Sequence, residues 1–488
     1  MLSKKIHMLS PVQSDATAEL IMPGIIDSHV HLLGTGLAML ELQVNHCRDL
    51  NDLHRVVNDY LDQFTGTWVI GRGWDQNKLG FELDKRLLDS LCPERPMLMY
   101  RVCGHVVAAN TQALVAAGVN RQTDDIPGGV IKRDDHGEPT GVFEERAMEL
   151  FEGSIPVPKR ELITSALDKA INYAHRYGIT GVQTDDLEVV GDYNTLWSYY
   201  QHAIEQLPLR VQLHHRIRAL SQLQEFSYIK KQQPDTEFIR VGAAKLFLDG
   251  SLGARTAALL ADYSDQPDTR GVLVYEDAEL REIVAFAEQH SVTLALHAIG
   301  DRAIEQALNA IAAVRGADSP GPVKHRLIHC QVTNTRQIKR MRNLGIIIEI
   351  QPGFLQTDMD WVWSRVGTDR LQTSYCWRSL AQSGLVLTGG SDAPVEDLNP
   401  WHGIATAVTR TNQAGEPARG WNRPEALDLP QALTAYTAAS ALLMGSDFGS
   451  VAAGKWADLA VYNDFDCDKL AANRPNRVII AGQTVYQR

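Results

Sequence analysis

From about residue 178 onward the chain repeats one pattern: a short apolar, β-branched run, then polar residues, then apolar residues at helical spacing. The pattern indicates βα units that build a parallel sheet. The strands expected are Gly24–His29, Gly178–Thr184, Val211–Ile217, Ile239–Leu248, Val292–His297, His325–His329, Gly345–Gln351 and Leu385–Thr388. Helical periodicity is clearest in Arg160–Tyr177, Asp277–His290 and Asp301–Val314, and we expect Asp301 to cap the last of these.

Eight alternating units predict an α/β fold of the (β/α)₈ TIM-barrel class. An open, doubly wound sheet is the alternative. Such a sheet places a glycine-rich phosphate loop after its first strand, and Gly34 and Gly36 alone do not make one. The pattern therefore favours the barrel.

Two segments fall outside the repeat. Residues 50–160 separate the first and second strands and predict an inserted lobe, in which residues 126–140 form two strands joined by a turn at Asp135–Gly137. Strand character returns in Trp456–Asn463 and Arg477–Gln487, with Gly482 in a hairpin turn. We expect a small β-sandwich-like appendage from residues 1–22 and 445–488, and a barrel from residues 23–49 and 161–444.

The composition is that of a globular protein: 44% of the 488 residues are hydrophobic and 22% are charged. A net charge of −12 opposes sequence-independent binding of nucleic acid. The sequence contains no run of about 20 apolar residues, so no membrane span is predicted. Pro11 interrupts the N-terminal region before the apolar core of a signal peptide develops. Six widely spaced cysteines predict free thiols in a reducing compartment, so we expect a cytoplasmic protein.

The strongest local motif is Asp27-Ser-His-Val-His31. Residues two apart on a strand face the same side, so His29 and His31 can offer imidazole nitrogens to one ion. Such a pair alone also arises by chance. Its position at the carboxyl end of the first expected strand, where barrel enzymes build their active sites, strengthens the metal-site interpretation.

Further candidate ligands fall at the ends of later strands. Lys245 lies on the fourth, His297 ends the fifth, His329 ends the sixth and Asp392 follows the eighth. Each alone has a structural alternative: a strand-end histidine is often simply hydrogen-bonded, and a lysine can extend its amine out of an apolar strand. Together they predict one cation site, because so many unpaired polar groups at one end of a barrel would destabilise it.

Distinctive motifs occur along nearly the full chain: Pro23–His31, Gly73–Asp75, Pro127–Gly129, Pro139–Val142, Lys245–Gly253, Leu296–Arg302, His329–Gln331, Ser391–Pro394 and Gly454–Asp458. They resemble those of the amidohydrolase superfamily, in particular its YtcJ-like branch of metal-dependent hydrolases.

The resemblance implies a site that holds one or two divalent ions, commonly zinc although another divalent metal is possible. Its ligands would be His29, His31, His297, His329 and Asp392, with Lys245 carboxylated by CO₂ and bridging two ions. Asp392 is also the expected general base and acid, because a carboxylate beside a metal-activated water can accept its proton and pass it to the leaving group. The expected reaction is hydrolysis of a non-peptide C–N bond, such as an amide, in a small molecule.

Three residues are expected to bind substrate. His105 matches a histidine-containing segment of the family, with an ordinary surface histidine as the alternative. Trp74 either contacts substrate or, with Asp75, fixes a loop. Arg255 either binds an acidic substrate group or pairs with Asp249 or Asp262.

Two departures from the family pattern leave alternatives open. Ile328 stands where an acidic residue usually precedes the sixth-strand histidine, and its loss is expected to weaken metal affinity or change the orientation of His329. The segment before the first strand is short, which predicts a reduced appendage. A deaminase, an ester or lactone hydrolase, or a barrel that has lost catalysis and acts by binding are the rival hypotheses. A homodimer is possible.

Overall fold

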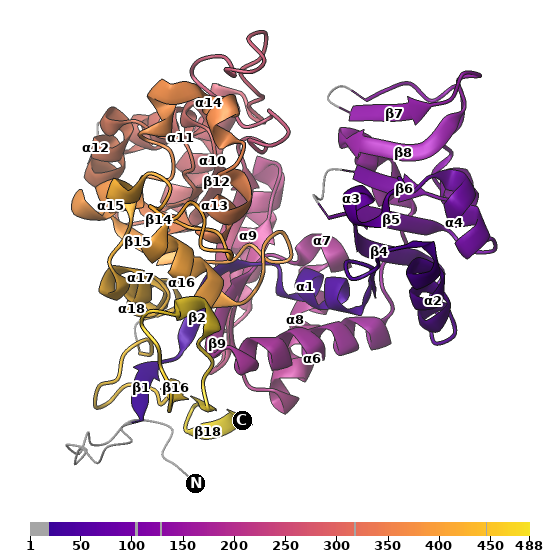
Figure 1. Ribbon diagram of the computed structural model, residues 1–488. Coiled ribbons are helices and arrows are strands. Elements are labelled where there is room, and N and C mark those ends of the chain that lie inside the picture. The colour runs from indigo at the N-terminus through magenta and orange to yellow at the C-terminus, as the bar shows by residue number, and fades with distance from the viewer. Residues whose placement is uncertain (1–18, 103–105, 127–128, 317–318, 446) are drawn as a thin grey trace. The chain divides into compact units, whose positions relative to one another are not determined.

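The computed structural model describes residues 19–102, 106–126, 129–316, 319–445 and 447–488 (Figure 1). The chain forms two compact units. The first comprises the described residues up to Gly36 and those from Arg160 to Arg488, and the second comprises Leu37–Lys159. Each unit has its own hydrophobic core.

The first unit contains the predicted barrel, which the structure confirms. Its eight strands are all parallel and adjacent in the order β2-β9-β10-β11-β12-β13-β14-β15. Their bounds are Ile25–Val30, Ile179–Thr184, Arg210–Arg216, Ile239–Phe247, Leu294–Ala298, Arg326–His329, Ile347–Ile350 and Val386–Gly389. Strands such as β2 and β9 are buried at every residue, as expected for parallel strands that are covered on both faces.

Helices follow the strands along the chain. They are α1 (Leu32–Leu40), α6 (Arg160–Arg176), α7 (Leu187–Val190), α8 (Tyr193–Gln206), α9 (Leu220–Gln232), α10 (Asp277–Gln289), α11 (Asp301–Arg315), α12 (Thr335–Leu344), α13 (Gly353–Asp358), α14 (Val362–Leu371), α15 (Trp377–Gln382), α16 (Pro400–Thr409), α17 (Leu429–Ala435), α18 (Ala438–Met444) and the 3₁₀ turn η2 (Arg423–Glu425). The helix α10 buries Leu280, Ile283, Val284 and Ala287, the spacing of an amphipathic helix.

One expected helix cap is wrong. The N-cap of α11 is Gly300, which has no side chain to bond the first turn. Asp301 lies inside the helix, and its Oδ1 accepts a hydrogen bond from the amide of Leu260 at 2.8 Å. Its carboxylate therefore anchors the preceding loop instead of capping the helix.

The barrel closes between β15 and β2 without a strand ladder in the described part of the chain. Loop contacts replace it: the amide of Asp392 donates to the carbonyl of His29 at 2.7 Å, and the amide of His31 donates to Ala393 at 2.8 Å. The buried Asp27 carboxylate accepts from the amides of Ser391 at 3.0 Å and His29 at 3.1 Å. These bonds fix the end of the first strand against the loop after the eighth.

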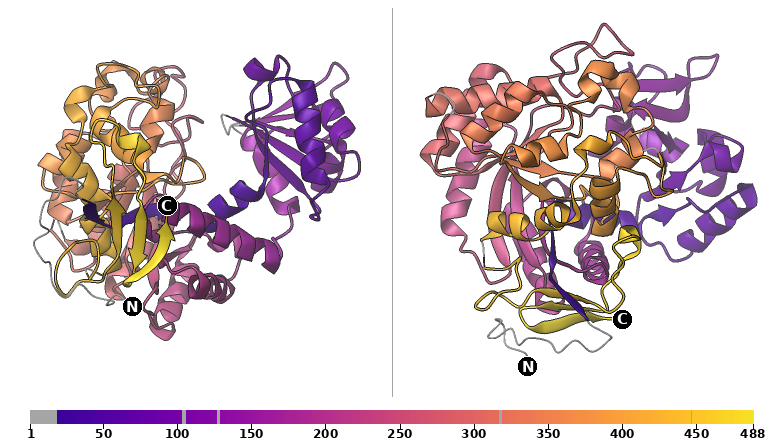
Figure 2. Two further views of the ribbon diagram at one scale, coloured as in Figure 1. Left: turned by 60° about the horizontal axis from the view of Figure 1, so that its bottom comes forward. Right: turned by 60° about the vertical axis from the view of Figure 1, so that its left-hand side comes forward.

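Both termini contribute to the predicted β appendage, which packs against the barrel (Figure 2). In the described residues it is a single antiparallel sheet, β1-β16-β17-β18, rather than two facing sheets. Its strands are Leu20–Pro23, Leu459–Tyr462, Arg477–Ile480 and Gln483–Gln487, and a 3₁₀ turn, η3, covers Leu470–Ala472. Ala481 and Gly482 turn the last hairpin, both at positive φ. Arg210 of β10 and Asp458 form a buried ion pair that joins barrel and sheet.

The second unit is built on a six-stranded mixed sheet in the order β3-β4-β5-β6-β8-β7. The strands are Leu42–Gln43, Val69–Trp74, Met97–Arg101, Val106–Ala109, Pro139–Glu145 and Gly129–Arg133 in that order, with helices α2 (Leu50–Leu61), α3 (Gln76–Leu79), α4 (Lys85–Leu91), α5 (Thr111–Ala117) and the 3₁₀ helix η1 (Arg146–Ser154). Alternate residues along β5 and β6 join two separate apolar clusters, so the sheet is covered on both faces. The hairpin predicted within residues 126–140 is confirmed as β7 and β8.

No helix among the described residues is long and apolar enough to cross a membrane. The cysteines that the structure describes are free thiols, as predicted: Cys47, Cys92, Cys330, Cys376 and Cys467.

We predict that burial of His175 makes the fold sensitive to acid. Its Nε2 donates to the carbonyl of Pro208 at 2.8 Å, and burial lowers the pKa of the imidazole to about 4. An unfolded histidine has a pKa near 6.5, so below that pH the unfolded state binds the proton more readily. The contribution of His175 to the free energy of unfolding is complete above pH 6.5. It falls by about 1.4 kcal/mol per pH unit as the pH drops toward 4.

The melting temperature measured from pH 7.5 to 5 checks this. We expect His175→Gln to show a smaller acid-induced drop than wild type, whereas the exposed His46→Gln should follow wild type. An equal drop in the His175 variant and wild type contradicts the prediction.

Candidate metal centre

The structure places all six predicted metal ligands at the carboxyl ends of barrel strands. They are His29 at the end of β2, His31 just after it, Lys245 in β11, His297 in β12, His329 at the end of β13 and Asp392 after β15. Five are buried and His31 is partly exposed. Residues more than 350 positions apart in the sequence thus reach one end of the barrel.

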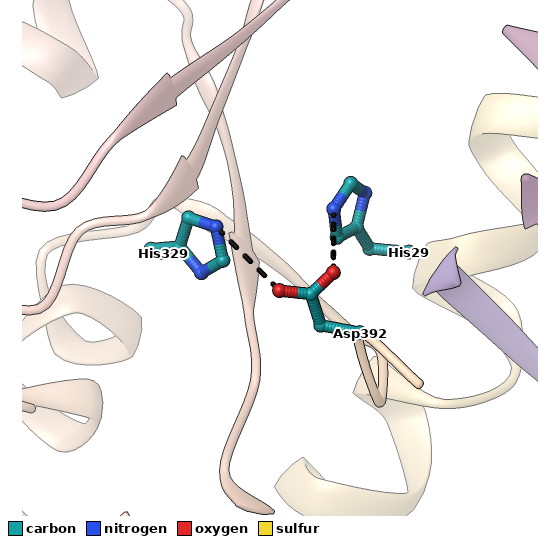
Figure 3. A group of neighbouring side chains, drawn as sticks. All are labelled: His29, His329 and Asp392. Atoms are coloured by element: carbon teal, nitrogen blue, oxygen red, sulfur yellow. Dashed lines mark ion pairs between the residues drawn. The ribbon is translucent and has the colours of Figure 1, made fainter. Parts of the chain in front are cut away.

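His29, His329 and Asp392 form the most compact group (Figure 3). One ligand atom from each lies within 4.8 Å of the others. The Nε2 atom of His29 is 3.3 Å from Asp392 Oδ1, and the Nε2 atom of His329 is 3.9 Å from Asp392 Oδ2. Each carboxylate oxygen thus faces a different imidazole.

His31 and Lys245 adjoin this group. His31 Nε2 is 3.3 Å from Asp392 Oδ1, and its Nδ1 donates to the carbonyl of Asp185 at 2.5 Å. That bond fixes the ring so that Nε2 faces the centre. Lys245 Nζ lies 3.1 Å from His29 Nε2, so its amine also points at the group.

His297 lies beside the group, with its ring 4.5 Å from that of His329. Its Nδ1 is 3.1 Å from Asp249 Oδ1. Asp249 in turn accepts backbone hydrogen bonds from Ala258, Ile299 and Gly300 at 2.8–3.1 Å. His297 thus faces a rigidly held carboxylate, and its role as a ligand stays a prediction.

The protonation states of the group suit a divalent cation. Burial lowers the pKa of His29 to about 3, so its imidazole is neutral at pH 7. Burial alone would raise the pKa of Asp392, but its interactions with the neighbouring imidazoles of His29 and His31 hold it well below its usual range. Neutral imidazoles and an ionised carboxylate are the forms in which these side chains bind metal.

An unused polar atom supports the same fit. The Nδ1 atom of His329 is buried and has no hydrogen-bond partner among the residues described. Imidazole nitrogen and carboxylate oxygen together form a donor set that zinc accepts. The residues present therefore fit a divalent ion.

Local backbone geometry turns two of these side chains inward. In β13, Arg326 bonds across the barrel interior and Ile328 packs there against Ala243 and Ala295, so strict alternation would point His329 outward. His329 instead has φ of 75°, and Asp392 has φ of 59°. Non-glycine residues rarely adopt these values, and such strain is typical of functional sites.

Sequence reasoning missed Asp185, which follows the last residue of β9. It is 4% exposed, and neither carboxylate oxygen has a hydrogen-bond partner within the described chain. Its neighbour Asp186 is different, because Thr184 and Tyr200 bond its Oδ2 at 2.5 and 2.6 Å. The only sequence signal for Asp185 was its position at a strand end, which Asp186 shares.

The structure describes two of the three expected substrate-binding residues. His105 is outside the described residues. Trp74 is 1% exposed in the core of the second unit, and its Nε1 donates to Met99 at 2.8 Å, which supports the structural alternative. Arg255 pairs with Asp265 through bonds of 2.9 and 3.1 Å, so the expected partners Asp249 and Asp262 were wrong. Substrate contacts of all three stay predictions.

Comparisons with known proteins point in one direction. A family model described as the amidohydrolase family matches residues 14–486. The chain is 35% identical to the putative amidohydrolase YtcJ of Bacillus subtilis, over 96% of this chain and 89% of that protein. It is 27% identical to the N-substituted formamide deformylase of Arthrobacter pascens, over 97% and 90%. A solved structure of an uncharacterized metal-dependent hydrolase from Pyrococcus horikoshii is similar with a TM-score of 0.75 and 25% identity, covering 96% of this chain and 88% of that one.

We predict that Gly390→Ala weakens metal binding. A Cβ atom at residue 390 would lie 2.6 Å from the backbone nitrogen of His29 and 2.9 Å from its Cβ, so the strand end that carries His29 must shift. Titration with Zn²⁺ against a chromophoric chelator should show a loss of affinity of about tenfold or more. Gly153→Ala is the control, because nothing lies within 4 Å of the added carbon. Unchanged Zn²⁺ affinity in Gly390→Ala contradicts the prediction.

Proposed function

This chain belongs to the amidohydrolase family, and we propose that it hydrolyses a non-peptide C–N bond, an amide, in a small molecule. Family membership confirms the resemblance found in the motifs and identifies a metal-dependent hydrolase. The observation that carries the proposal is the buried group of His29, His329 and Asp392 at the carboxyl end of the barrel. The similarity to a formamide deformylase supports a C–N bond as the target.

We assign the cation to His29, His31, His329 and Asp392, with His297 and Lys245 as further ligands. Zinc is the proposed ion because the donors are imidazoles and a carboxylate. When bound, the ion supplies Lewis acidity, which lowers the pKa of water and polarises the scissile carbonyl.

Lys245 suits a second role in the same site. Burial lowers the pKa of its amine to about 8, so a substantial fraction is neutral near pH 7.5. A neutral amine can attack CO₂ and lose a proton, which gives a carbamate with anionic oxygens. Carboxylation of Lys245 would therefore turn a cation that faces the ligands into a ligand itself.

Asp392 is the proposed proton carrier. It is ionised and faces the two imidazoles through both oxygens, so it is placed to accept a proton from the attacking water. The protonated carboxyl then donates to the leaving nitrogen, and the amine departs neutral. One side chain thereby serves as base and acid in turn.

Asp185 is the proposed acceptor for the substrate N–H. Its two oxygens are buried and without a partner in the described structure, and its backbone carbonyl holds His31, so it lies beside the centre. A buried carboxylate without a donor is costly, and an amide N–H would supply that donor. An ester has no such hydrogen, so Asp185 would favour amides.

The cytoplasmic location, the small-molecule substrate and the possible homodimer stay predictions.

Metal removal and Asp392→Asn test the function directly. We expect protein purified without chelator to contain bound divalent metal and to hydrolyse members of a panel of N-formyl and N-acyl amines. Chelation should abolish turnover and added Zn²⁺ should restore it. Asp392→Asn should lower kcat by about 10²- to 10⁴-fold, because it removes the proton carrier.

The matched control is Asp59→Asn, an exposed position in helix α2 of the second unit, which should leave kcat unchanged. A panel that also holds esters, lactones and aminated heterocycles separates the rival reactions. A protein that cannot be loaded with metal, or that turns over none of these compounds, would refute the proposal and favour a binding role.

Asp185→Asn tests the preference for amides. A hydrogen bond to a charged group contributes about 1.5–3 kcal/mol, so kcat/KM for an amide should fall roughly 10- to 100-fold. The ester of the same acyl group should lose much less. Asp186→Asn is the matched control: it should lower the melting temperature without changing the amide-to-ester ratio, because Asp186 bonds Thr184 and Tyr200. An unchanged ratio in Asp185→Asn contradicts the assignment.

A further inference from the structure

We propose that Glu349 is a positioning residue of the metal centre. Its carboxylate holds the His29 ring with Nδ1–H toward Glu349 and Nε2 toward the cation. The inference rests on the proposed function, because it concerns how that site is oriented. No family motif identified in the sequence contains Glu349, which lies in the seventh strand of the barrel, β14.

Glu349 and His29 face each other with unused polar atoms. The Oε2 atom of Glu349 is 3.9 Å from the Nδ1 atom of His29. Both atoms are buried, and neither has a hydrogen-bond partner in the residues that the structure describes. Buried polar atoms are seldom left unpaired, and here the separation exceeds hydrogen-bond length by less than about 1 Å. A small rotation of either side chain completes the bond.

The other oxygen of Glu349 is anchored. Arg326 Nη1 donates to Oε1 at 3.0 Å. The same guanidinium is held by Gln183 of β9 at 2.5 Å and by Gln212 of β10 at 3.2 Å. Glu349 therefore cannot turn away from the barrel axis without breaking this network, and its free oxygen stays directed at His29.

The chemistry of imidazole completes the argument. His29 Nε2 faces Asp392 and Lys245, so this is the nitrogen that meets a cation. A ligating nitrogen carries no proton, and the single proton of the neutral ring must then sit on Nδ1. A carboxylate opposite Nδ1 stabilises that tautomer and increases the basicity of Nε2.

Glu349 also has a defined place relative to Ile328. The two residues are paired in the register of β13 and β14. The carboxylate of Glu349 therefore lies at the level of Ile328 in the barrel interior, on the neighbouring strand β14. This carboxylate faces His29 instead of His329.

Glu349→Gln tests the proposal through metal affinity. The amide can still accept a hydrogen bond but has no charge to stabilise the Nδ1–H tautomer. We expect the dissociation constant for Zn²⁺, measured by competition with a chromophoric chelator, to rise about 10- to 100-fold. The absorption spectrum of the Co²⁺-loaded protein should change as well, because it reports the geometry around the ion.

Asp458→Asn is the matched control. It makes the same chemical change in another buried arginine–carboxylate pair, Arg210–Asp458, which joins the barrel to the β appendage and contacts none of the six predicted ligands. We expect a lower melting temperature but a Zn²⁺ dissociation constant within about twofold of wild type.

A double variant keeps the test decisive if the unpaired Arg326 prevents folding. Arg326→Met with Glu349→Gln removes both charges, so no buried charge is left alone. It should show the same loss of Zn²⁺ affinity. Wild-type affinity in the folded variants overturns the inference about Glu349, whereas a wild-type protein that binds no divalent ion overturns the proposed function itself.

Discussion

The junction between the last and first barrel strands is the constraint on which the metal centre depends. No ladder joins β15 to β2 in the described chain, and the junction is held by the Asp27 carboxylate and by amides of residues 31 and 392. His29 accepts a bond from Asp392 through its carbonyl while its ring faces the Asp392 side chain. The contacts that close the barrel therefore also set the distance between His29 and Asp392.

A polar layer lies beneath the centre, where small barrels usually carry branched apolar side chains. Arg326 bonds Glu349, Gln183 and Gln212, so the layer connects four strands. Such a network is stabilising only as far as its members are satisfied, and one of its atoms without a partner in the described residues, Oε2 of Glu349, faces His29. The layer thus links the packing of the barrel interior to the orientation of the site.

The eight strands and the ends that carry His29, Lys245, His329 and Asp392 were predictable, because apolar runs and strand ends are local properties of the sequence. The inward turn of His329 was not, since it depends on a positive φ that alternation excludes. Asp185 could not be told from Asp186, because only the positions of Thr184 and Tyr200 show which carboxylate is already bonded. Glu349 was equally hidden, because a glutamate in an apolar strand gives no sign of what it faces across a barrel.

Pairing of β1 with β16 has a consequence for biosynthesis. The strand Leu20–Pro23 is translated more than 430 residues before its partner Leu459–Tyr462. The next strand, β2, carries His29, which can contact Asp392 only after that residue has also been translated. A nascent chain can build the middle strands in order, but the metal site can form only after Asp392 has been translated and the pairing of β1 with β16 only after Tyr462, so a product truncated before Asp392 lacks both.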